Sequence, residues 1–283
     1  MKLTPRYDAP PIIAIDGAAG DQYEPVVRQR RRLAALLAEL DDDAWRSATR
    51  CDGWTVKDVI AHLDGTNVFW RHSVLAGLAG EPTRVLANFD PASTPPLMIE
   101  ASRETEPAEV LDQFIASNEA FLATLADLDE AQWSTVAESP AGHVPMRLLA
   151  HHALWDCWVH ERDIALPLGL TPTEEPDEVR SCLRYAAALS PALAISSGTE
   201  LGGVFAVDAN DPESCFVLDV GESVAVRDGS APDAAPCLRG AAVELTEALS
   251  IRAPLPSSTP EDWRRLLVGL AVAFDADLDA ADL

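Results

Sequence analysis

The stretch LWDCWVHERD, residues 154–163, places Asp156 and His160 four residues apart among two tryptophans and a cysteine. Side chains four residues apart lie one above the other on a helix, so this carboxylate and this imidazole converge on one point. The pattern predicts a helix over residues 145–166, and the sequence PLGLTPTEEP that follows ends it. The question is what holds a carboxylate and an imidazole at that point.

Apolar side chains surround this predicted helix on nearly every side, as expected for a helix buried in a bundle. They are Leu148, Leu149, Ala153, Leu154, Trp155, Cys157, Trp158 and Val159. The one polar stripe consists of His152, Asp156, His160 and Asp163. If the stripe faces inward, a cation or a hydrogen-bond network must compensate the buried carboxylate, which is costly when unpaired. The alternative is that the stripe is the solvated face of the helix.

The segment CDGWTVKDVIAHL predicts a second helix, from about residue 56 to the high seventies. Its start has a turn at Asp52 and Gly53, then Thr55 as the N-cap and Asp58 three residues later, an aspartate variant of the capping box. Trp54 is interpreted as a structural plug at this helix start. His62 flanks the apolar stripe of the helix, where a helix interior has no local use for an imidazole.

Other helices are predicted on both sides of these two. Their ranges are 21–40, 106–126 after the long connection GEPTRVLANFDPASTPP, and 176 to about 189 with a less certain continuation into SPALA. Every element expected between residue 21 and Gly198 is therefore a helix.

The pattern of apolar residues changes after Gly198. Three short alternating runs, GVFAVDA, SCFVLDV and SVAVRDG, predict strands, and GAAVELTEALSIR and PEDWRRLLVGLAVAFDADL predict two helices. The expected fold class is α+β, with an antiparallel helix bundle followed by a small α+β domain. The expected boundaries are an N-terminal extension over 1–21, the bundle over 22–197 and the C-terminal domain over 198–283.

Composition excludes several classes of partner. The 283 residues carry a formal charge of −25, which repels phosphate backbones and anionic lipid surfaces, so neither nucleic acid nor a membrane is expected as a partner. No apolar run approaches the length of a membrane span. The five cysteines form no CxxC pair, which suits a reducing compartment, and a cytoplasmic protein is expected. A monomer or a homodimer is compatible with the sequence.

Two histidines and one carboxylate form a facial ligand set for zinc or non-haem iron(II), with waters completing the coordination shell. His62, Asp156 and His160 supply such a set if the two helices face each other. Asp163 could orient a ligand imidazole as an outer acceptor or form a salt bridge with Arg162 or Arg184. The alternative interpretation is that each histidine is an ordinary core or surface residue without a metal.

Two stretches and the tail that follows them carry a resemblance to a known family. WRSATRCDGWTVKDVIAHLDG (45–65), then LWDCWVHERDIALPLG (154–169) and the α+β tail are similar to the mycothiol-dependent maleylpyruvate isomerase family. The likeness covers roughly residues 22–270. It implies a DinB-like metal-binding helix bundle followed by a small sterol-carrier-like α+β domain.

The resemblance also implies site residues and a reaction. It makes His62, Asp156 and His160 the ligands of Zn²⁺ or another divalent metal, although the usual carboxylate of the family at the middle position is glutamate. Arg252, in ELTEALSIR, matches an arginine of the family that is linked to catalysis. The implied activity is that of an isomerase or S-transferase that uses mycothiol as thiol cosubstrate on a small electrophile, with Arg252 binding a substrate carboxylate.

Two alternatives remain open at this point. The same three ligands could hold iron(II) for oxygen chemistry, as an enzyme of another class. The chain could also be a metal-binding or regulatory member of the bundle superfamily without activity.

Overall fold

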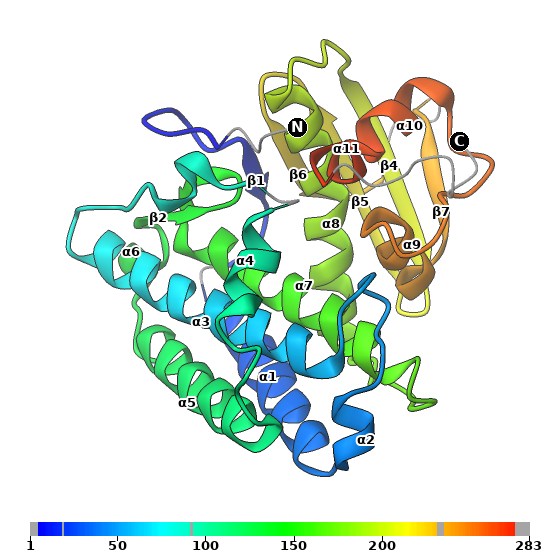
Figure 1. Ribbon diagram of the computed structural model, residues 1–283. Helices are drawn as coiled ribbons and strands as arrows, with labels where there is room; N and C mark the ends of the chain where they lie inside the picture. The colour runs from blue at the N-terminus through cyan, green and yellow to red at the C-terminus, as the bar shows by residue number, and fades with distance from the viewer. Residues whose placement is uncertain (1–4, 19, 91–92, 231–234, 275–283) are drawn as a thin grey trace.

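The structure is a computed structural model that describes residues 5–18, 20–90, 93–230 and 235–274. Four long helices form the bundle, and a mixed sheet with shorter helices forms the second layer (Figure 1). The bundle helices are α1 (Tyr23–Ala38), α3 (Val56–Leu78), α5 (Pro107–Leu125) and α7 (Met146–Ala165). The predicted α+β class is confirmed, and the bounds of these helices lie within a few residues of the predicted ones.

Local chemistry explains where α3 begins. The Thr55 side chain accepts a hydrogen bond from the backbone N–H of Asp58, and the Asp58 carboxylate accepts one from the backbone N–H of Thr55 at 2.9 Å. Both halves of the predicted capping box are therefore present. The cap fixes the first turn of α3, and with it the direction in which His62 projects.

Helix α8 (Pro176–Ser196) lies between the bundle and the sheet, as Figure 1 shows. It contacts α1 and α7 on one side and strands of the sheet together with the short C-terminal helices on the other. Its sequence contains Pro191, yet the helix continues through SPALA to Ser196. The predicted domain boundary at residue 197 would separate two folding units. Because α8 packs against both layers, that boundary stays a prediction.

The five-stranded sheet has the order β1-β6-β5-β4-β7. Its strands are β1 (Ile13–Ile15), β4 (Gly203–Asn210), β5 (Ser214–Val220), β6 (Val224–Asp228) and β7 (Cys237–Ala241). Strands β4, β5 and β6 form an antiparallel meander, whereas β1 pairs in parallel with β6 and β7 in parallel with β4. The three predicted strands are present, and β1 and β7 at the two edges were not predicted.

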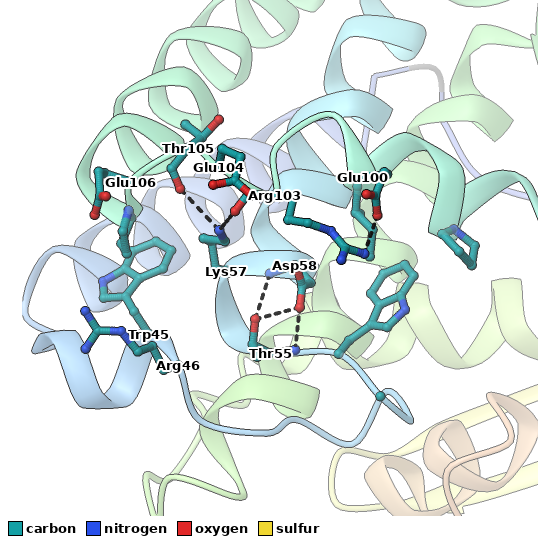
Figure 2. A pocket seen from close by; sticks show the side chains of 15 residues that line it. Trp45, Arg46, Thr55, Lys57, Asp58, Glu100, Arg103, Glu104, Thr105 and Glu106 are labelled. Atoms are coloured by element: carbon teal, nitrogen blue, oxygen red, sulfur yellow. Dashed lines mark hydrogen bonds and ion pairs between the residues drawn. The ribbon is translucent and has the colours of Figure 1, made fainter.

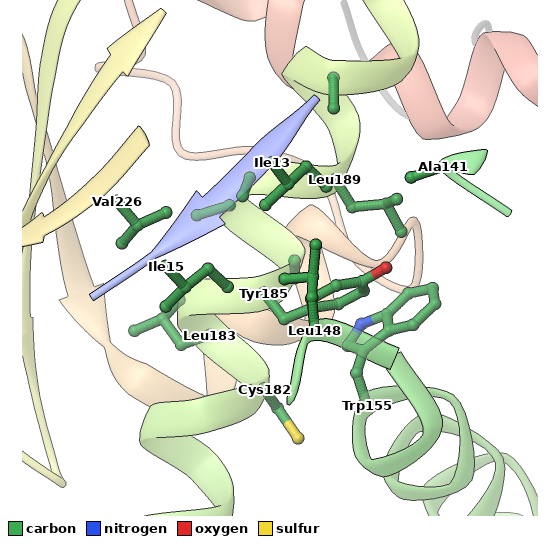
Figure 3. Packing of buried hydrophobic residues seen from close by; sticks show 14 of the residues in the cluster. Ile13, Ile15, Ala141, Leu148, Trp155, Cys182, Leu183, Tyr185, Leu189 and Val226 are labelled. Atoms are coloured by element: carbon green, nitrogen blue, oxygen red, sulfur yellow. The ribbon is translucent and has the colours of Figure 1, made fainter. Parts of the chain in front are cut away.

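The N-terminal segment is part of the sheet layer. Ile13 pairs with Val224 and Ile15 with Val226, so strand β1 closes the β6 edge of the sheet. Figure 3 shows Ile13 and Ile15 packed beside Val226, Leu183 and Tyr185, between the sheet and α8. No strand was predicted before Gly198, so β1 is an element that the sequence analysis missed in the N-terminal extension.

A second exception to the helical expectation is a two-stranded hairpin, β2 (Val136–Ser139) and β3 (Gly142–Pro145), directly before α7. Each strand has only four residues, and Pro145 leads directly into α7, so the run lacks the length and alternation that identify a strand. The connection before α5 also contains short helices: η1 (Val85–Asn88) and α4 (Thr94–Glu100). Two further one-turn helices, α2 (Asp42–Trp45) and α6 (Glu130–Trp133), precede α3 and β2.

The C-terminal helices are shorter than predicted. Helix α9 (Ala242–Leu249) ends just before Ser250, and the segment predicted as one last helix is divided into α10 (Glu261–Leu267) and α11 (Gly269–Ala273). A Cβ atom on Gly269 would lie 2.0 Å from the backbone oxygen of Ser190, so only glycine allows this approach to α8. The predicted end of that helix lies outside the described residues. No helix among the described residues is long and apolar enough to span a membrane.

Glu138 on β2 ties the hairpin to the loop after α3. Its carboxylate is fully buried and accepts hydrogen bonds from the Tyr7 hydroxyl and the Leu86 backbone N–H on one oxygen. The other oxygen accepts from the Thr83 hydroxyl and the Val85 backbone N–H. Two segments distant in sequence, one at Tyr7 and one at Thr83–Leu86, therefore depend on a single carboxylate of the hairpin.

Replacing Glu138 with alanine is expected to lower the free energy of unfolding by about 3 kcal/mol, because several buried donors lose their acceptor at once. Urea unfolding followed by circular dichroism measures the effect. The exposed Glu200 provides the matched control, since Glu200→Ala should change stability by less than about 0.5 kcal/mol. Equal effects of the two substitutions would contradict this role of Glu138.

Candidate metal centre

The polar stripe of α7 faces inward. The side chains of Asp156 and His160 are 14% and 12% exposed, and Asp163 is fully buried. The alternative of a solvated stripe is therefore wrong. Helices α1, α3 and α8 pack against α7. The apolar side chains of α7 hold these contacts, and the same packing buries the polar stripe.

The structure brings His62, Asp156 and His160 together. Their nearest ligand atoms all lie within 4.8 Å of one another, and His160 Nε2 is 3.7 Å from Asp156 Oδ1. The rings of His62 and His160 meet edge to face with centroids 5.2 Å apart. The three groups come from α3 and α7, two neighbouring helices of the bundle.

Two atoms of this cluster lack a partner. His62 Nδ1 and Asp156 Oδ2 are buried and form no hydrogen bond within the described part of the chain. Leaving a buried polar atom unsatisfied costs on the order of 1–3 kcal/mol, and more for a charged one. Both atoms have a lone pair that can coordinate a divalent cation. The residues therefore fit a metal site of the two-histidine, one-carboxylate type.

The two imidazoles of the cluster have opposite environments. Burial lowers the pKa of His62 to about 4, so its ring is neutral and available as a ligand. Burial acts in the same sense on His160, but hydrogen bonds with Asp163 and Cys51 outweigh it and raise its pKa to about 10. A metal at His160 therefore has to replace a proton, which makes the affinity for the metal dependent on pH.

The Asp156 carboxylate stays ionised despite its burial. Burial raises its pKa, but electrostatic interactions, with His160 first and Arg30 among the others, outweigh that effect and hold the pKa below its ordinary value. An ionised carboxylate is the form that binds a metal.

Asp163 organises the side of the cluster behind His160. His160 Nδ1 is 3.1 Å from Asp163 Oδ2, and Arg252 donates to both carboxylate oxygens at 2.8 Å. Arg50 donates to Oδ1 at 3.0 Å, and the Cys51 thiol to Oδ2 at 3.2 Å. A carboxylate on the second nitrogen of a ligand histidine fixes its tautomer and orientation. Of the partners considered from the sequence, the imidazole is present; the salt bridges are with Arg50 and Arg252, not with Arg162 or Arg184.

A second set of possible ligands consists of Cys51, His160 and Asp163, whose donor atoms also lie within 4.8 Å of one another. Here both oxygens of Asp163 already accept from guanidinium groups, and two positive charges stand beside them. A metal ion would have to displace these arginines. The set with unpartnered atoms, His62, Asp156 and His160, is therefore the better metal site.

Arg252 lies at this centre, behind His160. Its Nε and Nη2 edge is occupied by Asp163, while Nη1 has only a long contact of 3.5 Å with the Ser250 carbonyl. Nη2 is also 3.7 Å from the Cys51 sulfur, so the edge formed by Nη1 and Nη2 has only long contacts. The side chain is 19% exposed. Whether Arg252 binds the substrate stays a prediction.

Sequence reasoning missed the groups that join the two layers here. Glu247 on α9 accepts hydrogen bonds from Arg50 and Arg162, and Trp155 donates to the Ser250 hydroxyl at 2.8 Å. Glu247 lies in ELTEALSIR beside Arg252, but its partners are 85 and 197 residues away along the chain. No local signal in the sequence reveals pairs of such separation.

A pocket of about 720 Å³ adjoins the centre. Trp54 lines it and also packs against His62, with ring centroids 5.5 Å apart, so it does more than plug the start of α3. Figure 2 shows Lys57 in this pocket, donating to backbone carbonyls of the segment before α5. One indole ring therefore separates the pocket from a predicted metal ligand.

Residues 26–165 match the family model described as "Mycothiol maleylpyruvate isomerase N-terminal domain". This segment belongs to that domain family. The resemblance predicted from the sequence is thereby confirmed, and the matched residues include His62, Asp156 and His160. None of the curated proteins compared with the chain matches it significantly.

Two solved structures share the fold of this chain. One is the crystal structure of the mycothiol-dependent maleylpyruvate isomerase, and the other is a variant of it with one histidine replaced by alanine. Each has a TM-score of 0.61 at 14% sequence identity, over 84% of this chain and 91% of the other. The likeness therefore extends beyond the matched domain into the sheet layer.

Replacing Asp163 with asparagine is expected to lower the affinity for a divalent metal about 10- to 100-fold, the usual cost of losing an outer carboxylate on a ligand histidine. Competition with a chromophoric chelator measures it, and circular dichroism checks the fold. Asp177→Asn is the matched control, because Asp177 also pairs with an arginine but is 49% exposed and lies on α8. Unchanged affinity in the folded Asp163 variant would argue against an orienting role.

Proposed function

We propose that this protein is a metal-dependent enzyme of the maleylpyruvate isomerase type that uses a low-molecular-weight thiol, mycothiol, on a small electrophilic and anionic substrate. The reaction is a cis–trans isomerisation or a related S-transfer. The observation that carries the proposal is the pair of unpartnered buried atoms, His62 Nδ1 and Asp156 Oδ2, on residues that cluster with His160 in a chain of this family.

The proposed metal is Zn²⁺, held by His62, Asp156 and His160. When bound, it supplies a Lewis acid that lowers the pKa of a thiol, and the thiol supplies the nucleophile. Asp163 holds the ring of His160 in one orientation through Nδ1. The remaining edge of Arg252 would bind the carboxylate of the substrate, for which a planar guanidinium is well suited.

The surroundings of the centre support a small-molecule site. The pocket that Trp54 lines is on the other side of this indole ring from His62, so Trp54 is the residue through which a ligand in the pocket would influence the centre. The five cysteines are all free, in agreement with the proposed cytoplasmic location.

Elemental analysis of protein purified without oxygen, combined with an assay of maleylpyruvate isomerisation with and without mycothiol, tests the proposal. A single zinc ion per chain and turnover that requires the thiol are expected. Iron in place of zinc would favour the alternative of oxygen chemistry on the same ligands. Bound metal without any thiol-dependent turnover would favour a binding or regulatory protein.

A further inference from the structure

Arg30 on α1 is a positive charge in the middle of the bundle. It is fully buried, and among the described residues it donates hydrogen bonds only to neutral groups: the side chains of Asn67 and Asn118 and the carbonyl of Ala153. Its Nε atom has no partner among the described residues. Phe121 covers the guanidinium, with the ring centroid 5.1 Å away. A buried cation with neutral partners is costly unless an anion nearby offsets its charge.

The positions of the partners of Arg30 indicate which anion this is. Ala153 lies three residues before Asp156 on α7, and Asn67 lies five residues after His62 on α3. At a rise of about 1.5 Å per residue, the guanidinium is displaced roughly 5–8 Å along the helices from these ligands. Helix carbonyls point toward the C-terminus, so the group bound to Ala153 lies on the Asp156 side.

Asp156 is also the exception among the acidic residues around α7 and α8. The buried acidic residues of α7, α8 and α9 each contact an arginine directly: Glu161 and Glu178 contact Arg32, and Asp163 and Glu247 contact Arg50. The only ion-pair contact of Asp156 among the described residues is His160, at 3.7 Å. Arg30 and Asp156 are therefore a cation and an anion in one core, each incompletely paired.

We propose that Arg30 is a second countercharge of Asp156, beside His160, and that it raises the net charge of the metal centre. This inference rests on the proposed function. Without metal, His160 and Arg30 together offset the charge of the buried Asp156 carboxylate, so the bundle tolerates it. With a divalent ion bound by neutral imidazoles, the ion and Asp156 together carry one positive charge. Arg30 raises the net charge of the centre to two. The excess positive charge favours an anionic ligand such as a thiolate over a neutral one.

The first test is the affinity of the protein for zinc, measured by competition with a chromophoric chelator. Arg30→Met is expected to bind zinc about tenfold more tightly, because a positive charge is removed from near the ion. Thiocyanate added to the cobalt-loaded variant should bind about tenfold more weakly for the same reason. Arg30→Lys, which keeps the charge, should stay close to the wild type.

Asn118→Ala is the matched control, because it breaks the same buried network without changing its charge. It should lower the unfolding midpoint but leave the zinc affinity unchanged. If Arg30 were only a hydrogen-bonding residue, Arg30→Met and Asn118→Ala would affect zinc affinity alike. That outcome would overturn the proposal.

A double-mutant cycle on metal-free protein tests the pair independently of the metal. Arg30→Met, Asp156→Asn and the double variant are compared by urea unfolding, with Arg30→Gln as a second replacement if the methionine variant does not fold. The double variant is expected to be about tenfold more stable, in the folding equilibrium constant, than the sum of the single effects predicts. Additive effects would overturn the countercharge. A wild type that binds no metal but shows the coupling would overturn only the proposed function.

Discussion

Asp156→Ala is expected to lower the affinity for a divalent metal at least about 100-fold, and thiol-dependent turnover with it. The loss of an outer carboxylate costs about 10- to 100-fold, so the loss of a ligand should cost at least the upper value. The fold should persist, because α7 is held by the apolar side chains on its other sides. Elemental analysis of the purified variant and its circular dichroism spectrum measure the two effects.

The matched control for this experiment is Asp156→Glu. It keeps the charge and restores the longer carboxylate that is usual in the family, so it should retain the metal. Metal at full stoichiometry in the alanine variant would remove Asp156 from the site. Loss of metal in both variants, with the fold intact, would show that the position tolerates only the shorter side chain.

Arg252→Lys is expected to reduce kcat/KM about 100-fold while the metal content stays unchanged. An ammonium group offers a point charge, so it cannot bond both oxygens of Asp163 and also present a planar edge to a substrate carboxylate. Steady-state kinetics with mycothiol and maleylpyruvate measures the effect, and elemental analysis confirms that the metal is retained.

Arg239→Lys is the control for the exchange itself. Arg239 is on β7, pairs with Asp208 and is 70% exposed, so its replacement should leave the kinetics as they are. An Arg252→Lys variant with wild-type kinetics would contradict the proposed binding of the substrate carboxylate by Arg252. The substrate anion would then have no identified partner. A Lys variant that instead loses its metal would mean that Arg252 acts through Asp163 on His160, as a positioning residue.

The helices of the bundle were predictable from the sequence because their causes are local. Apolar residues at helical spacing, the capping box at Thr55 and Asp58, and a proline at the start of α5 and of α8 act within a few residues of one another. The convergence of Asp156 with His160 is equally local, since both lie on one helix. Their approach to His62 followed from the family resemblance together with the apolar face of α3.

The short strands were not predictable in the same way. Strand β1 has three residues and is stable only because β6 and α8 offer it a partner and a core more than 160 residues away. The break between α10 and α11 likewise depends on the contact of Gly269 with Ser190. Neither feature leaves a periodic signal in its own segment.

The sequence by itself determined the helical bundle and the α+β tail, because helix periodicity and capping need only neighbouring residues. It also placed Asp156 and His160 on one face of α7, whereas the family resemblance supplied His62 as the third predicted ligand. The tertiary structure alone decided the charge pattern of the centre. It placed Asp163 among His160, Arg50 and Arg252, and it placed Arg30 in the core with neutral partners. Charges interact through space, and the residues that carry them here come from distant segments, so only the folded chain defines which charges are paired.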